Sequence, residues 1–549
     1  MKLLKLHTGI ILLGMVGWQE ISAQLVIDNA QFFIQPGATV TVQGNVTSNV
    51  DIQGTGILEM KGTALQNINM NGFTVPNLVI DNTSHVALTG PARVSGIITF
   101  TNGKMQLGAH NFTLAAAAAF AGTPGTNKFI ETNGVGIVRK EITAVGNYIL
   151  PVGAGSRYEP VQYQVTGSPA LASAFLAARA ITGGHPNKHP RSTDYLNQYW
   201  KLTNGGITGG TIAATGTYNT EATDLTGVET NIRSLYWNGT AWVAGTGVNN
   251  GVNSVTIPVV AGATQDLYAM NTFVLLRTKA FLQGPYNSTT SRMNDRLRNS
   301  GAYVPGVLPA SNVIPTSDPY RTAPYNFAHT NNTVAESVVS ASFPNPFIDQ
   351  ANADNNIVDW VFLELRSNVT PGNTVIQTRS ALLQRDGDIV DIDGVNPVYF
   401  KNVPGTNYTV VVKHRNHIAM STNPAVFNQA LALVPNATAL DFTTAPAANI
   451  LGAANTNYVN SGTTHLLYAG NANFNTNVRW SPPSSDKDYI LGTVLTGNAP
   501  TVLSNSYSVG DMDMNRTVRW SPPNSDKDYI LSTPLLNVAS TVKSQVLPN

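Results

Sequence analysis

A fourteen-residue segment near the C-terminus occurs twice, and this repeat constrains the fold more than any other feature of the chain. Val478–Leu491 recurs 40 residues later as Val518–Leu531, with thirteen of the fourteen positions identical. So close a match between neighbouring segments indicates a tandem duplication. Two copies of one sequence are expected to fold into two copies of one small structural unit.

Oxygen-bearing side chains stand at alternate positions just ahead of each copy. Alternate oxygens on a tight loop are the pattern that binds Ca²⁺, which takes about six to eight hard oxygen ligands, and the last ligand usually comes from the start of a following helix. The candidate ligands of the second copy are Asp511, Asp513, Asn515, Thr517 and Asp526. Those of the first copy are Asn471, Asn473, Asn475 and Asp486.

The acids also have a purely structural interpretation. Ser525–Asp528 and its earlier counterpart fit the Ser-x-x-Asp pattern that caps a helix N-terminus, where acids also interact favourably with the helix dipole. The loops have Arg516 and Thr476 where calcium loops normally have glycine, and a β-branched threonine at positive φ would be strained. The first loop has only amides before Asp486, so we expect it to hold an ion more weakly than the second.

The N-terminus has the pattern of a secretory signal peptide over residues 1–23. Two lysines precede an apolar stretch from Gly9 to Trp18, and small residues at Ser22 and Ala23 place the cleavage before Gln24. That stretch is shorter than the ~20 residues that cross a bilayer, and no later segment is long and apolar enough. The pattern predicts export to the extracellular space or the outer cell surface, with no membrane span in the mature chain.

Composition narrows the fold class and the partners. Charged residues make up only 11% of the chain, against about 25% in ordinary soluble proteins. Asn, Thr, Ser and Gly replace them and favour turns and strand edges over helices. The chain has no cysteine, which excludes disulfides and thiolate metal sites. The net charge is +1 and there are no long basic runs, so the sequence gives no indication of a nucleic-acid-binding surface.

The strand pattern divides the mature chain into four modules of a mainly β protein. Residues 24–121 hold many short strands separated by Gly and Asn, such as Thr39–Val42, and predict a β-solenoid-like module in preference to a β-sandwich. Longer strands with aromatic residues predict antiparallel β-sandwich modules over 122–274 and 275–440. The duplicated calcium-loop repeats, 441–549, form a small α-containing module.

Several segments carry local predictions. Leu171–Ala180 admits either a helix or a buried strand. Asn238-Gly239 predicts a β-hairpin, and a short helix is expected over Met293–Arg298. Val358–Arg366 and Tyr408–Arg415 largely alternate, as half-buried strands of an antiparallel sandwich do.

Other polar and aromatic groups admit a functional and a structural interpretation. Asp386–Gly394 fits a Ca²⁺ site between strands less well than a charged hairpin. His414 and His417, three apart on one strand, are expected on opposite faces and therefore as poor partners for a metal. His185 and His189 are expected to be hydrogen-bonded or solvated. Core packing is favoured over sugar stacking for the tryptophans Trp237, Trp242, Trp480 and Trp520.

Two parts of the chain resemble known protein families. The duplicated end resembles the dockerin type I repeat, with an insertion between loop and helix. Such repeats fold around calcium, and in cellulosome dockerins they bind cohesin modules. Most of the mature chain resembles hemagglutinin or adhesin-like surface proteins of Gram-negative bacteria that use type IX secretion. The most specific stretches are Phe281–Tyr286, Val358–Arg366, Ser380–Asp388 and Lys413–His417.

The sequence therefore predicts a secreted or cell-surface adhesin or scaffold. It lacks the motifs of serine hydrolases, zinc proteases, phosphate loops and dinucleotide sites, so we assign no catalytic residue and expect no enzyme. The expected partner is an unknown protein or glycan at a cell surface. The alternative is an extracellular polysaccharide-active enzyme or its carbohydrate-binding accessory subunit, which a carboxylate pair in a groove of the solenoid would favour.

Overall fold

The protein is mainly β, with 46% strand and 6% helix, as predicted. The computed structural model describes residues 24–221, 223–298, 312–339, 352–367, 373–403, 407–424, 429–430, 438–481, 484–522 and 525–548, so the predicted signal peptide lies outside the described residues. The chain forms two compact units, one up to Asn271 and one from Thr272 onward.

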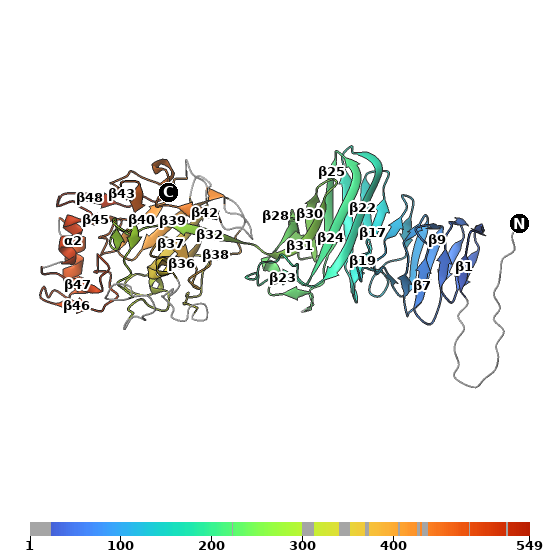
Figure 1. Ribbon diagram of the computed structural model, residues 1–549, viewed down its shortest axis with the longest axis horizontal. Coiled ribbons are helices and arrows are strands. Elements are labelled where there is room, and N and C mark those ends of the chain that lie inside the picture. Colours follow the sequence, from blue (N-terminus) through green and yellow to red (C-terminus); the bar gives the residue numbers. More distant parts are fainter. Residues whose placement is uncertain are drawn as a thin grey trace, which may run out of the picture. The chain divides into compact units, whose positions relative to one another are not determined.

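The first unit begins with a β-solenoid of about 6 turns (Figure 1). Each coil contributes short parallel strands to three sides. One side contains β1 (Leu25–Ile27), β4 (Val46–Ser48), β7 (Gln66–Asn69), β10 (Val86–Leu88), β13 (Met105–Gln106) and β16 (Ile130–Glu131). The second contains β3 (Thr39–Val42), β6 (Ile57–Met60), β9 (Asn77–Asp81), β12 (Ile97–Asn102) and β15 (Ala119–Ala121). The third contains β2 (Phe32–Ile34), β5 (Ile52–Gly54), β8 (Thr74–Val75), β11 (Ala92–Val94), β14 (Phe112–Leu114) and β17 (Val138–Glu141).

Apolar stacks inside the solenoid and amide side chains at its corners hold the coils together. Leu58, Leu78 and Ile98 pair in register on neighbouring strands and are buried, so each coil covers the apolar side of the next. At one corner Asn77 accepts a hydrogen bond from the Ile97 amide (2.7 Å) and donates one to the Thr55 carbonyl (2.8 Å). Neutral amides that satisfy backbone groups between coils explain why asparagine is abundant where charge is scarce.

The solenoid continues into an antiparallel sandwich. Strand β17 pairs with β22 (Ala170–Thr182), which pairs with β24 (Gln198–Thr208), and β24 pairs with β31 (Thr264–Asn271). Leu171–Ala180 is therefore a strand. The same sheet includes β23 (Tyr195–Leu196), β26 (Leu225–Thr226) and the hairpin predicted at Asn238-Gly239, formed by β27 (Ile232–Trp237) and β28 (Trp242–Ala244). The opposing sheet contains β18 (Gly146–Leu150), β21 (Val161–Thr166), β25 (Thr211–Thr217), β30 (Ser254–Val259) and β29 (Gly247–Asn249).

The second unit is built on a nine-stranded sheet. Its central path runs β38 (Val398–Lys401), β32 (Phe273–Lys279), β37 (Asp388–Val390), β36 (Val375–Gln384), β35 (Ile357–Ser367), β39 (Asn407–His414) and β40 (His417–Ser421). Strand β41 (Gln429–Ala430) joins β39, and β42 (Thr438–Asp441) joins β32. Small hairpins lie outside it: β33 (Tyr286–Asn287) with β34 (Arg292–Met293), and β43 (Val459–Ser461) with β44 (Thr464–Leu466).

The prediction of half-buried strands in this sheet is wrong. Strand β35 is buried at every position from Ile357 to Leu365, and β39 is almost entirely buried as well. The reason is that both faces of the sheet are covered. Phe362 packs against Tyr320 on one face, and Asp359, which points the other way, accepts a hydrogen bond from Tyr507 of the repeat region.

The predicted helix over Met293–Arg298 is also wrong. Met293 belongs to β34, and a turn follows it. Backbone partners from distant segments replace helical ones, since the Met293 amide donates to the Arg385 carbonyl and the Asn294 amide to the Pro285 carbonyl, both at 2.8 Å. Tertiary hydrogen bonds therefore override a short and weak helical preference.

The two repeats exchange strands. The first copy has β45 (Asn477–Arg479), α1 (Asp486–Tyr489) with a π-helical continuation Ile490–Val494, and β46 (Val502–Ser504). The second has β47 (Thr517–Arg519), α2 (Asp526–Ser532) and β48 (Val542–Ser544). Strand β45 pairs with β48, and β46 pairs with β47, so each copy completes the other (Figure 1). In the part of the chain that the structure describes, no helix is long and apolar enough to cross a membrane.

Candidate metal centre

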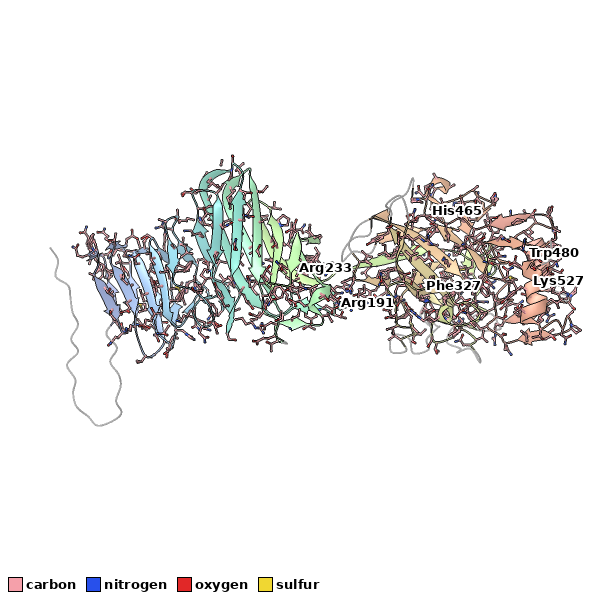
Figure 2. The ribbon with its side chains drawn as sticks, turned by 180° about the vertical axis from the view of Figure 1, so that it is seen from behind. Arg191, Arg233, Phe327, His465, Trp480 and Lys527 are labelled. Atoms are coloured by element: carbon pink, nitrogen blue, oxygen red, sulfur yellow. The ribbon has the colours of Figure 1, made fainter. Side chains whose placement is uncertain are left out.

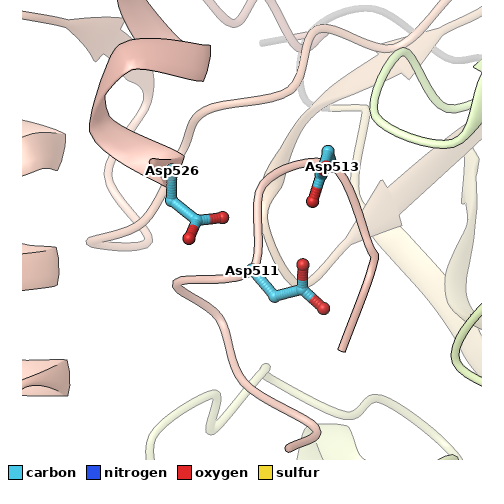
Figure 3. Close-up of side chains that lie close together, drawn as sticks. All are labelled: Asp511, Asp513 and Asp526. Atoms are coloured by element: carbon cyan, nitrogen blue, oxygen red, sulfur yellow. The ribbon is translucent and has the colours of Figure 1, made fainter. Parts of the chain in front are cut away.

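Three of the predicted ligands in the second repeat come together. A ligand oxygen from each of Asp511, Asp513 and Asp526 lies within 4.8 Å of the others. Figure 3 shows Asp526 at the start of its helix and the other two carboxylates on the preceding loop, around a common space. Asp511 and Asp526 are buried, at 0% and 3% exposure. Asp513 is half-buried. A space bounded by three carboxylate oxygens suits a hard cation.

Hydrogen bonds within the loop hold Asp511 and Asn515 in place. The Asp511 carboxylate accepts from the amides of Asn515 (2.9 Å) and Arg516 (2.8 Å). The Asn515 side-chain oxygen accepts from the Thr517 amide (2.8 Å), at the start of β47. Arg516 does adopt positive φ, +76°, at the position where glycine is usual, and its guanidinium donates to Asn505 (2.7 Å).

The two acids of the following helix have separate tasks. Asp526 turns inward, where its carboxylate accepts from the amides of Met512 (2.8 Å) and Arg519 (2.9 Å). Ser525 and Asp528 form the predicted cap, because the Asp528 amide donates to the Ser525 hydroxyl. The capping and ligand interpretations are thus compatible, since they concern different carboxylates.

The electrostatics of the three carboxylates are unfavourable without a compensating charge. Burial raises the pKa of Asp511 to about 7, although Arg415 opposes the shift. Burial, together with the charge of Asp511, raises the pKa of Asp526 well above its usual range. Asp513 accepts from the Asn515 side chain with one oxygen (2.8 Å), and its other oxygen is buried without a hydrogen-bond partner among the described residues. A bound cation would relieve both the repulsion and the unpaired oxygen.

The first repeat has the same frame with fewer charges. The Asp486 carboxylate accepts from the amides of Ala472 and Arg479, both at 2.9 Å, as Asp526 does 40 residues later. Burial raises its pKa to about 7. Asn471 stands in place of Asp511 and donates its amide to the Asn475 carbonyl (2.8 Å), while Asn473 accepts from the Asn475 amide (3.3 Å). The asparagine side chains of this loop hydrogen-bond within the loop. The first loop therefore offers one carboxylate to an ion, whereas the second offers three.

The strain foreseen at Thr476 does not arise. The left-handed residue of the first loop is Phe474, with φ +60°, and Thr476 is not among the residues with positive φ. Phe474 corresponds to Met514 of the second loop, which also has positive φ (+56°), so the first loop lacks only the additional left-handed residue that the second loop has at Arg516. The Phe474 side chain packs against the core of the second unit.

One residue of the central sheet holds both loops. The Asn416 side chain donates to the Asp511 carbonyl (2.6 Å), and the Asn416 carbonyl accepts from the amides of Gly470 (3.0 Å) and Asn471 (3.1 Å). Sequence reasoning missed this role, although Lys413–His417 was among the specific stretches. The partners lie 95 and about 55 residues away, so no local pattern could have indicated them.

The expectation that His414 and His417 point to opposite faces is wrong. The chain turns at Arg415-Asn416, which makes the two histidines cross-strand neighbours, with 3.0 Å between their Nδ1 atoms. His414 Nε2 lies 3.0 Å from the Asp359 carboxylate, and His417 Nε2 accepts from the Gly284 amide (3.1 Å). Burial lowers the pKa of both histidines, so they form a neutral hydrogen-bonded pair.

The other candidate groups have protein partners. Along Asp386–Gly394, Lys279 lies 2.9 Å from Asp388 and Arg379 lies 2.7 Å from Asp391, as in a charged hairpin. His185 lies 3.1 Å from Asp266 within a cluster of aromatic rings. Trp242 is buried, whereas Trp480 and Trp520 are half-buried, with Lys487 over the ring of Trp480 and Lys527 over that of Trp520. Figure 2 labels Trp480 and Lys527, one from each copy of the repeat.

The solenoid also presents two carboxylates on one face. Lys61 lies 3.0 Å from Asp81 and 3.9 Å from Glu59. Hydrogen bonds from Asn102 and Lys61 lower the pKa of Asp81.

No family model, no curated protein and no solved structure matches this chain.

Proposed function

We propose that the protein is a secreted or cell-surface adhesin or scaffold that binds a protein or glycan, and that its duplicated end contains a structural Ca²⁺ site. The observation that carries the proposed ion site is the convergence of Asp511, Asp513 and Asp526, whose ligand oxygens lie within 4.8 Å of one another. The resemblance to adhesin-like surface proteins and to dockerin type I repeats supports the wider function.

The close approach of the three carboxylates destabilises the fold, and a bound ion would remove this destabilisation. Three acids in one buried space repel each other, and an uncompensated buried charge destabilises a fold by several kcal/mol. Ca²⁺ would accept one oxygen from each acid, the side chain of Asn515 and the carbonyl of Thr517. The first loop, with Asp486 as its one acid, would bind the ion far more weakly.

The ion would stabilise the whole second unit. Asn416 ties the Asp511 loop to the central sheet, and Arg415 of the same hairpin donates to the Ser508 carbonyl just ahead of that loop. Tyr529 of α2 donates to the carbonyl of Gln283 (3.3 Å). The repeats thus act within this chain, as a support for the sheet that would carry a binding surface.

A pair of matched variants tests the ion site. Asp511→Ala with Asp513→Ala should abolish the rise in melting temperature that Ca²⁺ gives over chelator, while Asn471→Ala with Asn473→Ala should retain it. Calorimetry of the mature chain measures the shift, and Mg²⁺ serves as a second ion. An undiminished Ca²⁺ response in the aspartate variant would disprove the site.

A separate experiment tests the wider function. Terminal-peptide mass spectrometry of the surface and medium fractions should find the chain starting at Gln24. Purified mature protein should bind cells or immobilised glycans and leave soluble polysaccharides uncleaved. Cleavage of a polysaccharide would support the enzyme alternative instead.

A further inference from the structure

The first unit contains a buried carboxylate without a partner. Glu159 is 0% exposed, and neither of its carboxylate oxygens has a hydrogen-bond partner among the described residues. A buried acid that is left unpaired is rare, because an isolated charge in a protein interior is strongly destabilising.

Glu159 lies where the solenoid meets the sandwich. It follows β20 (Arg157–Tyr158), and its amide donates to the Val152 carbonyl (3.0 Å) of β19 (Val152–Ala154). The Trp200 indole of strand β24 donates to the Glu159 carbonyl (2.9 Å). These contacts place Glu159 against the inner face of the sheet beside Trp200.

A second unpaired polar group stands on the same face. Gln198 is two residues before Trp200 on β24, so the two side chains share a face of the sheet. Gln198 is 0% exposed, and neither its amide nitrogen nor its amide oxygen has a hydrogen-bond partner in the part of the chain that the structure describes. Two independent side chains thus bring unpaired polar atoms into one interior region.

An ion pair closes the region on the other side. Arg157 forms a salt bridge with Asp224, which is 2% exposed. The Asn197 amide, next to Gln198, donates to the Asp224 carbonyl (2.8 Å), and the Arg157 guanidinium reaches the Asn197 carbonyl (3.5 Å). Both charges also act on Glu159, since that of Arg157 lowers its pKa and that of Asp224 raises it.

We propose that Glu159 and Gln198 form a buried site for a hard, oxygen-preferring metal cation, with the Arg157–Asp224 ion pair beside it. Carboxylate and amide oxygens are the ligands of such ions, and one cation would engage both Glu159 oxygens and the Gln198 oxygen together. A proton on Glu159 is the competing explanation, since burial raises the pKa of this carboxyl to about 8. Glu159 makes no hydrogen bond to Gln198, so a proton alone leaves the Gln198 oxygen unpaired, whereas a cation would bind it.

Hydrogen exchange with mass spectrometry of the full mature chain tests the site locally. Ca²⁺ and Na⁺ are added separately in a choline background at fixed ionic strength. One of the two should slow exchange in the peptides around Glu159 and Gln198. The near-isosteric Glu159→Gln variant should lose that response and keep the Ca²⁺ response of the repeat loops, which serves as the internal control.

The outcomes separate the two explanations. Exchange that neither cation alters, or a response that persists in E159Q, would show a protonated carboxyl and overturn the proposal. If E159Q fails to fold, seen as fast exchange throughout the first unit, Gln198→Met decides. It removes one ligand oxygen and should raise the half-maximal cation concentration by roughly tenfold; an unchanged midpoint would again overturn the site.

Discussion

Asp526 and Asp486 offer a matched comparison, because they occupy equivalent positions but only Asp526 lies beside two other carboxylates. Each begins the helix of its repeat, and each accepts two backbone amides at 2.8–2.9 Å from equivalent positions. Replacing either by asparagine leaves one oxygen for two amides and turns an NH₂ group toward the second. The loss of that buried hydrogen bond should destabilise the second unit by about 1–3 kcal/mol in both variants.

The difference should appear only with Ca²⁺. At a free ion concentration about 100-fold above the dissociation constant, binding adds ~2.7 kcal/mol to the free energy of unfolding. A stabilisation of that size raises the melting temperature of a unit this large by roughly 5–10 °C. Asp486→Asn should keep this rise, and Asp526→Asn should lose most of it, because only Asp526 faces two other carboxylates.

Paired calorimetric scans of the full mature chain measure both quantities. In chelator, the two variants should melt within a degree or two of each other. In Ca²⁺, the melting temperatures of wild type and D486N should rise by the same amount, whereas that of D526N should rise much less. An equal rise in both variants would refute the reasoning, since the loop acids would then have no part in ion binding.

Three further predictions concern the contacts around the loops. Asn416→Ala should weaken both repeats at once, lowering the melting temperature of the second unit and, by titration calorimetry, the Ca²⁺ affinity; an effect confined to stability would show that the residue does not position the Asp511 loop. Protons act on the second unit in opposite directions. Burial holds the pKa of His414 and His417 below that of an unfolded histidine, so their contribution to stability is lost below about pH 6.5, whereas the raised pKa of Asp486, Asp511 and Asp526 makes acid favour the folded state. Replacing His414 and His417 by glutamine should therefore remove a loss of stability between pH 7 and 5, as denaturant titrations of variant and wild type should show; an identical pH dependence in the two proteins would contradict the neutral histidine pair. Burial alone would raise the pKa of Asp359, but Arg415 and His414 hold it at about 2, so its contribution to stability is lost below about pH 4. Removing residues 542–549 deletes the partner of β45 and should increase exchange in the first repeat more than in the second; the reverse order would contradict the strand exchange.

Short-range patterns predicted much of this molecule. Strands bounded by Gly and Asn, as at Thr39–Val42, indicated the solenoid because each coil repeats the same local pattern. The convergence of Asp511, Asp513 and Asp526 also followed from spacing, since alternate positions on a tight loop and the first residue of the next helix point inward together.

Features that depend on distant partners escaped prediction. The burial of β35 on both faces depends on what covers the sheet, although its nearly continuous apolar run from Val358 to Leu365 was a sign of it. The turn after Met293 replaced a helix because amide partners came from Arg385 and Pro285. No sequence pattern around Asn416 indicates its role, because that role depends on loops that are distant in sequence and fold against it.

The exchange of strands between the two repeats has a consequence for their origin. The hydroxyl of Ser481 donates to the Ala539 carbonyl and that of Ser521 to the Ala499 carbonyl, so the same contact is made twice with the roles of the copies reversed. Such reciprocity is the signature of two-fold symmetry. A chain with a single repeat would have to find these pairings in another molecule. The duplication therefore corresponds to a homodimer whose two halves were joined into one polypeptide, which makes its assembly independent of concentration.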